Sequence, residues 1–192
     1  MSSRSRSGAQ DLARIAVFAA LIIVLGAITV PLVGGVPVTG QTLGVMLAGT
    51  VLGWRRAPFA VLTVLGLAAV GLPVLAGGRG GIGAFVGPTA GYMFGWIAAV
   101  IVIGLIVQAG SWKWWQVGLA TLIGGIPVIY LFGIPVQAFV TGVDLGTTAL
   151  SSLMFLPGDL VKVVVATALT LALRKAYPRA FGGIAPRTAV AS

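Results

Sequence analysis

The feature that most constrains this chain is a pair of opposite charges within a long apolar stretch. From residue 114 to residue 173 the only charged side chains are Asp144, Asp159 and Lys162. Asp159 and Lys162 are three residues apart, so a helix places both on one face. A charge at the centre of a membrane-spanning helix costs about 2.5 to 3.5 kcal/mol and needs a partner. The pair either ties helices together or meets a polar ligand, and we favour a ligand because ionisable residues inside membranes usually serve function.

The composition indicates a membrane protein. Hydrophobic residues make up 58% of the 192 residues and charged residues 8%, whereas soluble domains are about 25% charged. The chain has no Cys, no His and no Glu, so thiol chemistry, imidazole metal sites and most acid–base catalysis lack side chains. We therefore expect no enzyme, no metal site and no cofactor. The net charge of +9 is spread between apolar segments, so we expect no nucleic acid as partner.

Six apolar segments approach the length of about 20 residues that a spanning helix needs. They cover residues 15–33, 40–54, 57–76, 83–108, 114–133 and 150–173. The second is short, and we expect it to enter the membrane from an ordered loop. The sequence thus predicts an all-α membrane protein with an N-terminal tail at 1–11, a six-helix transmembrane domain at 12–176 and a C-terminal tail at 177–192.

The basic residues predict the orientation of these segments. With the N-terminus in the cytoplasm, ten of the twelve Lys and Arg residues lie on the cytoplasmic side, Arg79 lies on the opposite side, and Lys162 lies within the membrane. Basic residues favour the cytoplasmic side of membrane proteins. We therefore predict a multi-pass cell-membrane protein with both termini cytoplasmic. Impermeant labelling of single cysteines introduced at positions 4 and 80 tests this orientation.

Two loops between the segments offer polar groups. Thr39 and Gln41 precede or begin the second segment; capping accounts for Thr39, but the amide of Gln41 needs partners in an apolar helix. Residues 78–83 match a dinucleotide-binding pattern without the acid that it requires, so we interpret them as a flexible extracytoplasmic loop. Arg79 in this loop either attracts an anionic ligand or is a solvated charge.

Small residues four apart predict close helix contacts. Gly87, Gly91 and Gly95 form one such face, which we expect to pack within the chain. Ala16 and Ala20 form another in the first segment, and that face either packs internally or receives a partner helix.

The start of the last segment predicts how its charges lie. Pro157 suits the first turn of a helix, so Asp159 lies near a helix N-terminus that favours its carboxylate. Lys162 follows one turn deeper and faces the same cavity. A small ligand with a carboxylate and N–H donors satisfies both charges, and so does a zwitterion.

Four stretches, in this order and spacing, resemble the BioY family, the biotin-binding S components of energy-coupling factor (ECF) vitamin transporters. They are residues 37–49, 71–78, 87–95 and 157–162, and the resemblance covers roughly residues 12–176. The chain departs from the usual family pattern at Gly40, where a bulkier apolar residue is common, and at Ala90, where Gly is common. Neither departure removes a polar ligand group.

The resemblance implies a six-helix fold that binds biotin near the extracytoplasmic side. It also implies partnership with a transmembrane T component and two ATPase subunits, and the chain itself lacks a phosphate-binding loop for ATP. Biotin has a carboxylate for Lys162 and ureido N–H groups for Asp159, although which end meets which residue stays open. The Ala16 and Ala20 face resembles the surface that docks on the T component. The candidate substrate-binding residues are Thr39, Gln41, Arg79, Gly91, Tyr92, Asp159 and Lys162.

Three alternatives remain at this point. The first is an S component for another vitamin, such as riboflavin or thiamine, which shares the fold. The second is a proton-coupled secondary carrier of a small anionic or zwitterionic solute, with Asp159 as its proton relay. The third, a membrane-embedded enzyme, is disfavoured by the lack of His, Cys and Glu.

Overall fold

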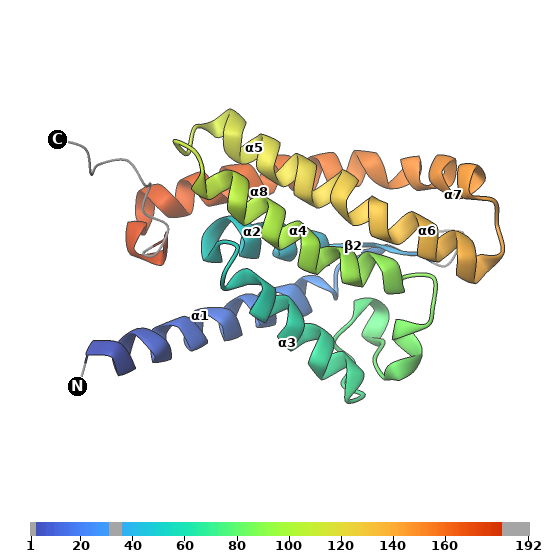
Figure 1. Cartoon of the computed structure of the whole chain (residues 1–192), viewed down its shortest axis with the longest axis horizontal. Coiled ribbons are helices and arrows are strands. Elements are labelled where there is room, and N and C mark those ends of the chain that lie inside the picture. Colours follow the sequence, from blue (N-terminus) through green and yellow to red (C-terminus); the bar gives the residue numbers. More distant parts are fainter. Residues whose placement is uncertain (1–2, 31–35, 182–192) are drawn as a thin grey trace.

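The computed structural model describes residues 3–30 and 36–181, and most of this chain forms six helical rods in one bundle (Figure 1). Four rods are single helices: α1 (Ser3–Leu25), α2 (Gln41–Leu52), α3 (Ala57–Ala69) and α4 (Ala90–Gln108). The fifth joins α5 (Trp114–Ile123), the π-helical turn η3 (Gly124–Val128) and α6 (Ile129–Thr141). The sixth joins α7 (Leu145–Ser152), the 3-10 turn η4 (Leu153–Phe155) and α8 (Leu156–Ala176). The predicted all-α, six-helix fold is confirmed.

Short elements connect the rods. Strands β1 (Thr29–Val30) and β2 (Val38–Thr39) pair antiparallel between α1 and α2, with Thr29 opposite Thr39. Between α3 and α4 lie the 3-10 turns η1 (Ala76–Gly78) and η2 (Ile82–Phe85), and η5 (Pro178–Phe181) follows α8.

Four of the rods are long and apolar enough to span a membrane: Gly8–Leu25, Ala90–Gln108, Trp114–Thr141 and Leu145–Ala176. Helices α2 and α3 have 12 and 13 residues, so they cover about 18 to 20 Å of a hydrocarbon core that is about 30 Å thick. The start of α1 and the end of α8 lie at the same end of the bundle (Figure 1). This arrangement is what an even number of crossings requires; which end faces the cytoplasm stays a prediction.

The first helix begins and ends earlier than the predicted span at 15–33. It begins at Ser3 and ends at Leu25, because the chain turns at Gly26, where a Cβ atom would lie 2.9 Å from the carbonyl oxygen of Ile23. Part of the predicted N-terminal tail is thus helical, and the boundary predicted between residues 11 and 12 lies inside α1. Residues 1–2 and 31–33 of these segments lie outside the described residues.

The other spans differ at ends where glycine and proline act. Helix α3 ends at Ala69 rather than at 76, because Gly71 adopts a φ of +99° and Pro73 follows. Helix α4 begins at Ala90 rather than at 83, just after Pro88. The fifth rod continues to Thr141 and the sixth begins at Leu145, so both exceed the predicted segments.

Asp144 explains the early start of the last rod. Its exposed carboxylate accepts the backbone N–H of Thr147 at 3.0 Å and so caps α7. This hydrogen bond lowers the pKa of Asp144. Asp144 therefore has a local structural role outside the membrane-spanning helices.

The beginning of the predicted C-terminal tail packs on the bundle. Phe181 is buried against Trp112, with ring centroids 5.3 Å apart in an edge-to-face arrangement. Residues 182–192 of that tail lie outside the described residues.

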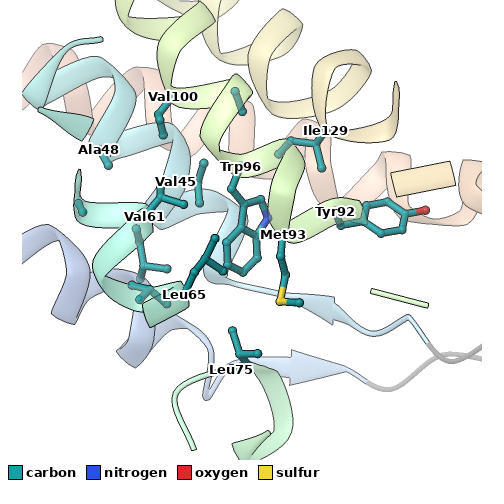
Figure 2. Packing of buried hydrophobic residues seen from close by; sticks show 14 of the residues in the cluster. Val45, Ala48, Val61, Leu65, Leu75, Tyr92, Met93, Trp96, Val100 and Ile129 are labelled. Atoms are coloured by element: carbon teal, nitrogen blue, oxygen red, sulfur yellow. The ribbon is translucent and has the colours of Figure 1, made fainter. Parts of the chain in front are cut away.

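Helix α4 passes through the core (Figure 2). Its Met93, Trp96 and Val100 pack against α2, through Val45 and Ala48, and against α3, through Val61 and Leu65. The outer faces of the rods instead expose large apolar side chains, such as Phe139 at 90%. Such side chains suit contact with the apolar core of a bilayer. Inside the bundle, residues of α2, α4, α6 and α8 line a cavity.

Candidate functional site

The Asp159–Lys162 pair lies in the first two turns of α8, as predicted. Pro157 occupies the first turn of this helix, where its missing N–H leaves no hydrogen bond unmade. The Nζ atom of Lys162 lies 2.9 Å from Oδ1 of Asp159. Asp159 is buried, with 5% of its surface exposed, so the ion pair is desolvated and sits at the wall of the bundle interior.

Two further side chains hold this pair. Tyr130 of α6 donates its hydroxyl to Oδ2 of Asp159 at 2.7 Å, and Lys162 Nζ donates to Oγ1 of Thr42 in α2 at 2.9 Å. Each carboxylate oxygen thus has one donor and keeps a lone pair. The ammonium has three N–H groups and uses two, so one remains for a ligand. The pair is fixed in place and still able to bind.

Tyr92 contributes a wall to the same region. Its hydroxyl donates to Oε1 of Gln137 at 2.7 Å, and its ring meets the ring of Tyr130 edge to face, with centroids 6.2 Å apart. A Cβ atom at Gly133 would collide with the ring of Tyr92, so this glycine makes room for the aromatic wall.

Gln41 is buried at the start of α2, but the chain itself uses its amide. Oε1 accepts the backbone N–H of Ala76 at 3.1 Å, and Nε2 donates to the carbonyl oxygen of Val74 at 3.2 Å. The amide therefore finds the partners that its position requires in the α3–α4 connection. It holds this segment over the site, and because Gln41 also lines the cavity, one amide N–H and one lone pair of Oε1 remain for a ligand.

The two remaining polar candidates lie toward the rim. Thr39 Oγ1 accepts the backbone N–H of Gln41, the first residue of α2, at 3.2 Å, but the N-cap position is Gly40, which has no side-chain cap hydrogen bond. Arg79 is exposed and donates Nε to the carbonyl oxygen of Ala76 at 3.1 Å. Its terminal guanidinium nitrogens remain for an anionic group.

Gly91 is the one candidate that does not line the site. It lies where α4 contacts α6, and a Cβ atom there would meet the carbonyl oxygen of Phe132 and the side chain of Val136. Its function is close helix packing, as the small-residue pattern predicted, rather than ligand contact.

These groups surround one cavity that is open on one side. Among the described residues, no cluster of three or more His, Cys, Asp or Glu side chains is present that could hold a metal ion. The cavity is lined by Val36, Pro37, Val38, Thr39, Gln41, Thr42, Leu75, Ala76, Arg79, Thr89, Tyr92, Met93, Trp96, Gly125, Ile129, Tyr130, Phe155, Asp159 and Lys162.

Among the lining residues that the sequence did not mark as candidates, three with polar groups matter most for the site: Thr42, Trp96 and Tyr130. Thr42 follows Gln41 directly, and its hydroxyl in an apolar helix was a usable signal. Trp96 lies four residues after Tyr92, so helical spacing places both on neighbouring parts of one face. Tyr130 had no such signal, because its contact with Asp159 depends on how α6 packs beside α8.

A mostly apolar cavity with a buried ion pair at its wall suits a small, partly polar solute. Together with six apolar rods, this site defines a multi-pass membrane transporter.

Comparison with known proteins names the family. The sequence model of the BioY family matches residues 1–179 of this chain. The chain is 46% identical over 178 residues to the biotin transporter BioY of Rhizobium etli, covering 88% of this chain and 95% of that protein. It is 48% identical over 167 residues to the BioY of Rhodobacter capsulatus, covering 79% and 86%. The chain belongs to the BioY family, and the prediction that it is not an enzyme is confirmed.

A solved structure agrees with this assignment. The crystal structure of the S-component for biotin from an ECF-type ABC transporter matches with a TM-score of 0.83 and 32% sequence identity. The match covers 91% of this chain and 95% of that one. The predicted S-component fold is therefore confirmed.

Proposed function

We propose that this chain is the membrane subunit that binds biotin for uptake, the S component of an ECF-type transporter. Its relatives are named biotin transporters, and the solved structure that it resembles is an S component for biotin. The observation within the chain that carries the proposal is the buried Asp159–Lys162 pair at the wall of a mostly apolar cavity. Biotin combines a polar ureido ring, an apolar thiophane ring and a carboxylate, and such a cavity suits all three.

The geometry of the pair favours one orientation of biotin. The ureido group and the carboxylate lie at opposite ends of the molecule, so two side chains in contact at 2.9 Å meet the same end. A carboxylate beside Asp159 is repelled by its charge. A ureido group instead gives an N–H to Asp159 and a carbonyl oxygen to the free N–H of Lys162. We therefore assign the ureido ring to the pair, and the carboxylate to Arg79 at the rim.

The remaining lining supports the apolar part of the ligand. Tyr92, Met93 and Ile129 border the cavity between the pair and the rim, and they provide contact area for the thiophane ring and the alkyl chain. In this proposal Gln41 fixes the segment over the site, and Gly91 fixes the packing of α4 on α6. Gly91 acts on the shape of the site, whereas Gln41 also lines the cavity and keeps one N–H and one lone pair for biotin.

A binding titration tests the proposed function. The purified protein, in detergent or lipid, is titrated with biotin, riboflavin and thiamine under identical conditions. We expect saturable binding of biotin at one site and none of the other two vitamins at the same concentrations. Binding of riboflavin or thiamine in place of biotin would favour an S component for another vitamin.

We further propose that a transmembrane T component and two ATPase subunits energise uptake. The chain has no phosphate-binding loop of its own. Ala16 and Ala20 are both exposed on α1, next to Val17, which is 64% exposed. Helix α1 thus presents small side chains outward, and small faces let a partner helix approach closely.

Bulky residues on this face are expected to weaken assembly. Ala16→Trp and Ala20→Trp should reduce co-purification with the T component, because the added rings hold the helices apart, while biotin binding stays unchanged. Val164→Trp, at an exposed position of α8, is the matched control and should assemble normally. Normal co-purification of both α1 variants would show that partners dock elsewhere.

A further inference from the structure

Trp96 carries a polar group that the site described so far leaves unused. The residue lies in α4 and lines the cavity, with 5% of its surface exposed. Its Nε1 atom is the one buried side-chain nitrogen or oxygen among the described residues that has no hydrogen-bond partner. Asp159, Lys162 and Tyr92, in contrast, each have a partner within the chain.

Such an atom needs an explanation, because native proteins leave few buried polar groups unpaired. An indole can only donate through its nitrogen, so the missing partner is an acceptor. Trp96 packs within a cluster of buried, mostly apolar side chains, and no described group accepts a hydrogen bond from its nitrogen. A phenylalanine would suit these neighbours without an unpaired N–H group. A hydrogen-bond acceptor on a bound ligand accounts for the indole.

The indole nitrogen lies on the cavity side of the ring. Figure 2 shows it on the ring edge nearer to Tyr92 and Met93, whereas the opposite edge lies against Leu65. Tyr92 and Met93 both line the cavity. The unbranched side chain of Met93 changes rotamer readily, so a ligand in the cavity can reach the N–H group beside it.

We propose that Trp96 determines specificity by donating its indole N–H to the ureido carbonyl oxygen of biotin. This inference rests on the proposed function and on the orientation assigned above. A carbonyl oxygen accepts two hydrogen bonds, which leaves one for Lys162 and one for Trp96. The carboxylate is the less suitable acceptor, because Trp96 is buried whereas Arg79 lies exposed at the rim. A solute without an acceptor at this point leaves the N–H unpaired and binds less well.

Ligand analogues and one substitution together test this assignment. Trp96→Phe keeps an aromatic ring and removes the N–H, and Trp54→Phe, at a tryptophan that does not line the cavity, is the matched control. Each purified protein is titrated with three ligands: biotin; thiobiotin, in which sulfur replaces the ureido oxygen; and dethiobiotin, which lacks the ring sulfur. We expect Trp96→Phe to weaken biotin binding about three- to tenfold, the effect of one hydrogen bond, and Trp54→Phe to leave it unchanged.

The differences between ligands identify the atom that Trp96 contacts. The preference for biotin over thiobiotin should shrink about three- to tenfold in Trp96→Phe, while the preference over dethiobiotin should stay the same. The inference would be overturned if Trp96→Phe kept the full preference for biotin over thiobiotin. It would also be overturned if only the preference for biotin over dethiobiotin decreased. Failure of the unsubstituted protein to bind biotin would instead overturn the proposed function, and this inference with it.

A second measurement uses the unsubstituted protein and covers the case in which Trp96→Phe does not fold. The chain has five tryptophans, and ¹⁵N labelling gives each indole N–H its own NMR signal. We expect one indole proton to move downfield with biotin and to move less with thiobiotin. Equal responses of all indole signals to the two ligands would contradict a bond to the ureido oxygen.

Discussion

Replacing Lys162 with alanine is expected to weaken biotin binding by about 2 to 5 kcal/mol, the usual effect of removing one partner of a buried charged pair. The change removes the N–H that we assign to the ureido carbonyl. It also leaves Asp159, which is 5% exposed, with Tyr130 as its remaining donor. Calorimetric titration of the purified variant measures the loss, and thermal unfolding in parallel establishes that the variant is folded.

Controls separate the charge from general effects of substitution. Lys175→Ala removes an exposed lysine at the other end of α8 and should bind biotin normally. Biotin amide, which lacks the carboxylate charge, tests the orientation. Each protein binds biotin amide less tightly than biotin by some factor. We expect this factor to be the same in Lys162→Ala as in the unsubstituted protein, and smaller in Arg79→Ala. If Lys162→Ala binds biotin and biotin amide equally well, Lys162 contacts the carboxylate, and biotin has the opposite orientation to the one that we assign.

Asp159→Asn is expected to lower biotin affinity by a similar amount, about 2 to 5 kcal/mol. The asparagine is nearly the same shape, but its neutral oxygen is a weaker acceptor for the ureido N–H than a carboxylate. Its NH₂ group also replaces an oxygen that accepts from Tyr130 or from Lys162. The buried ammonium then loses its counter-charge. Titration of the variant with biotin measures its affinity, and titration with riboflavin or thiamine measures its selectivity.

Asp144→Asn is the matched control for this change, since it makes the same substitution at an exposed cap of α7. It should leave biotin affinity unchanged. Normal affinity in a folded Asp159→Asn protein, and also in Lys162→Ala, would assign the pair a purely structural role. That outcome would leave the cavity without its main polar recognition group.

Local spacing was sufficient to predict part of this site. The i, i+3 spacing of Asp159 and Lys162 and the position of Pro157 fixed one face of one helix, and the structure has the two side chains in contact. The spacing of Gly91 and Gly95 likewise predicted a close contact, which α4 makes with α6. These features depend on helix geometry alone, so they can be derived without knowing which helices are neighbours.

Contacts between distant segments could not be predicted in the same way. The amide of Gln41 needed partners, and two of them are backbone groups of Val74 and Ala76, which no local pattern in the sequence indicated. Tyr130 was missed because no residue near it in the sequence indicates that its hydroxyl contacts Asp159, which lies 29 residues further along the chain. The first helix was placed too late because hydropathy measures the apolar run and not the turn that Gly26 makes.

The π-helical turn η3 at Gly124–Val128 holds an extra residue without changing the faces that the fifth rod presents. A π-helical turn contains about one more residue than an α-helical turn, and each is one full turn of the helix. Loss of one residue from η3 would therefore close it to an α-helical turn and leave α6 in nearly the same rotation relative to α5. Tyr130 and Gln137 would still face Asp159 and Tyr92, which they hold by hydrogen bonds. Relatives that are one residue shorter within this turn should consequently hold the buried carboxylate with a side chain at the same place on α6, whereas a deletion elsewhere in α5 or α6 would turn that side chain away by about 100°.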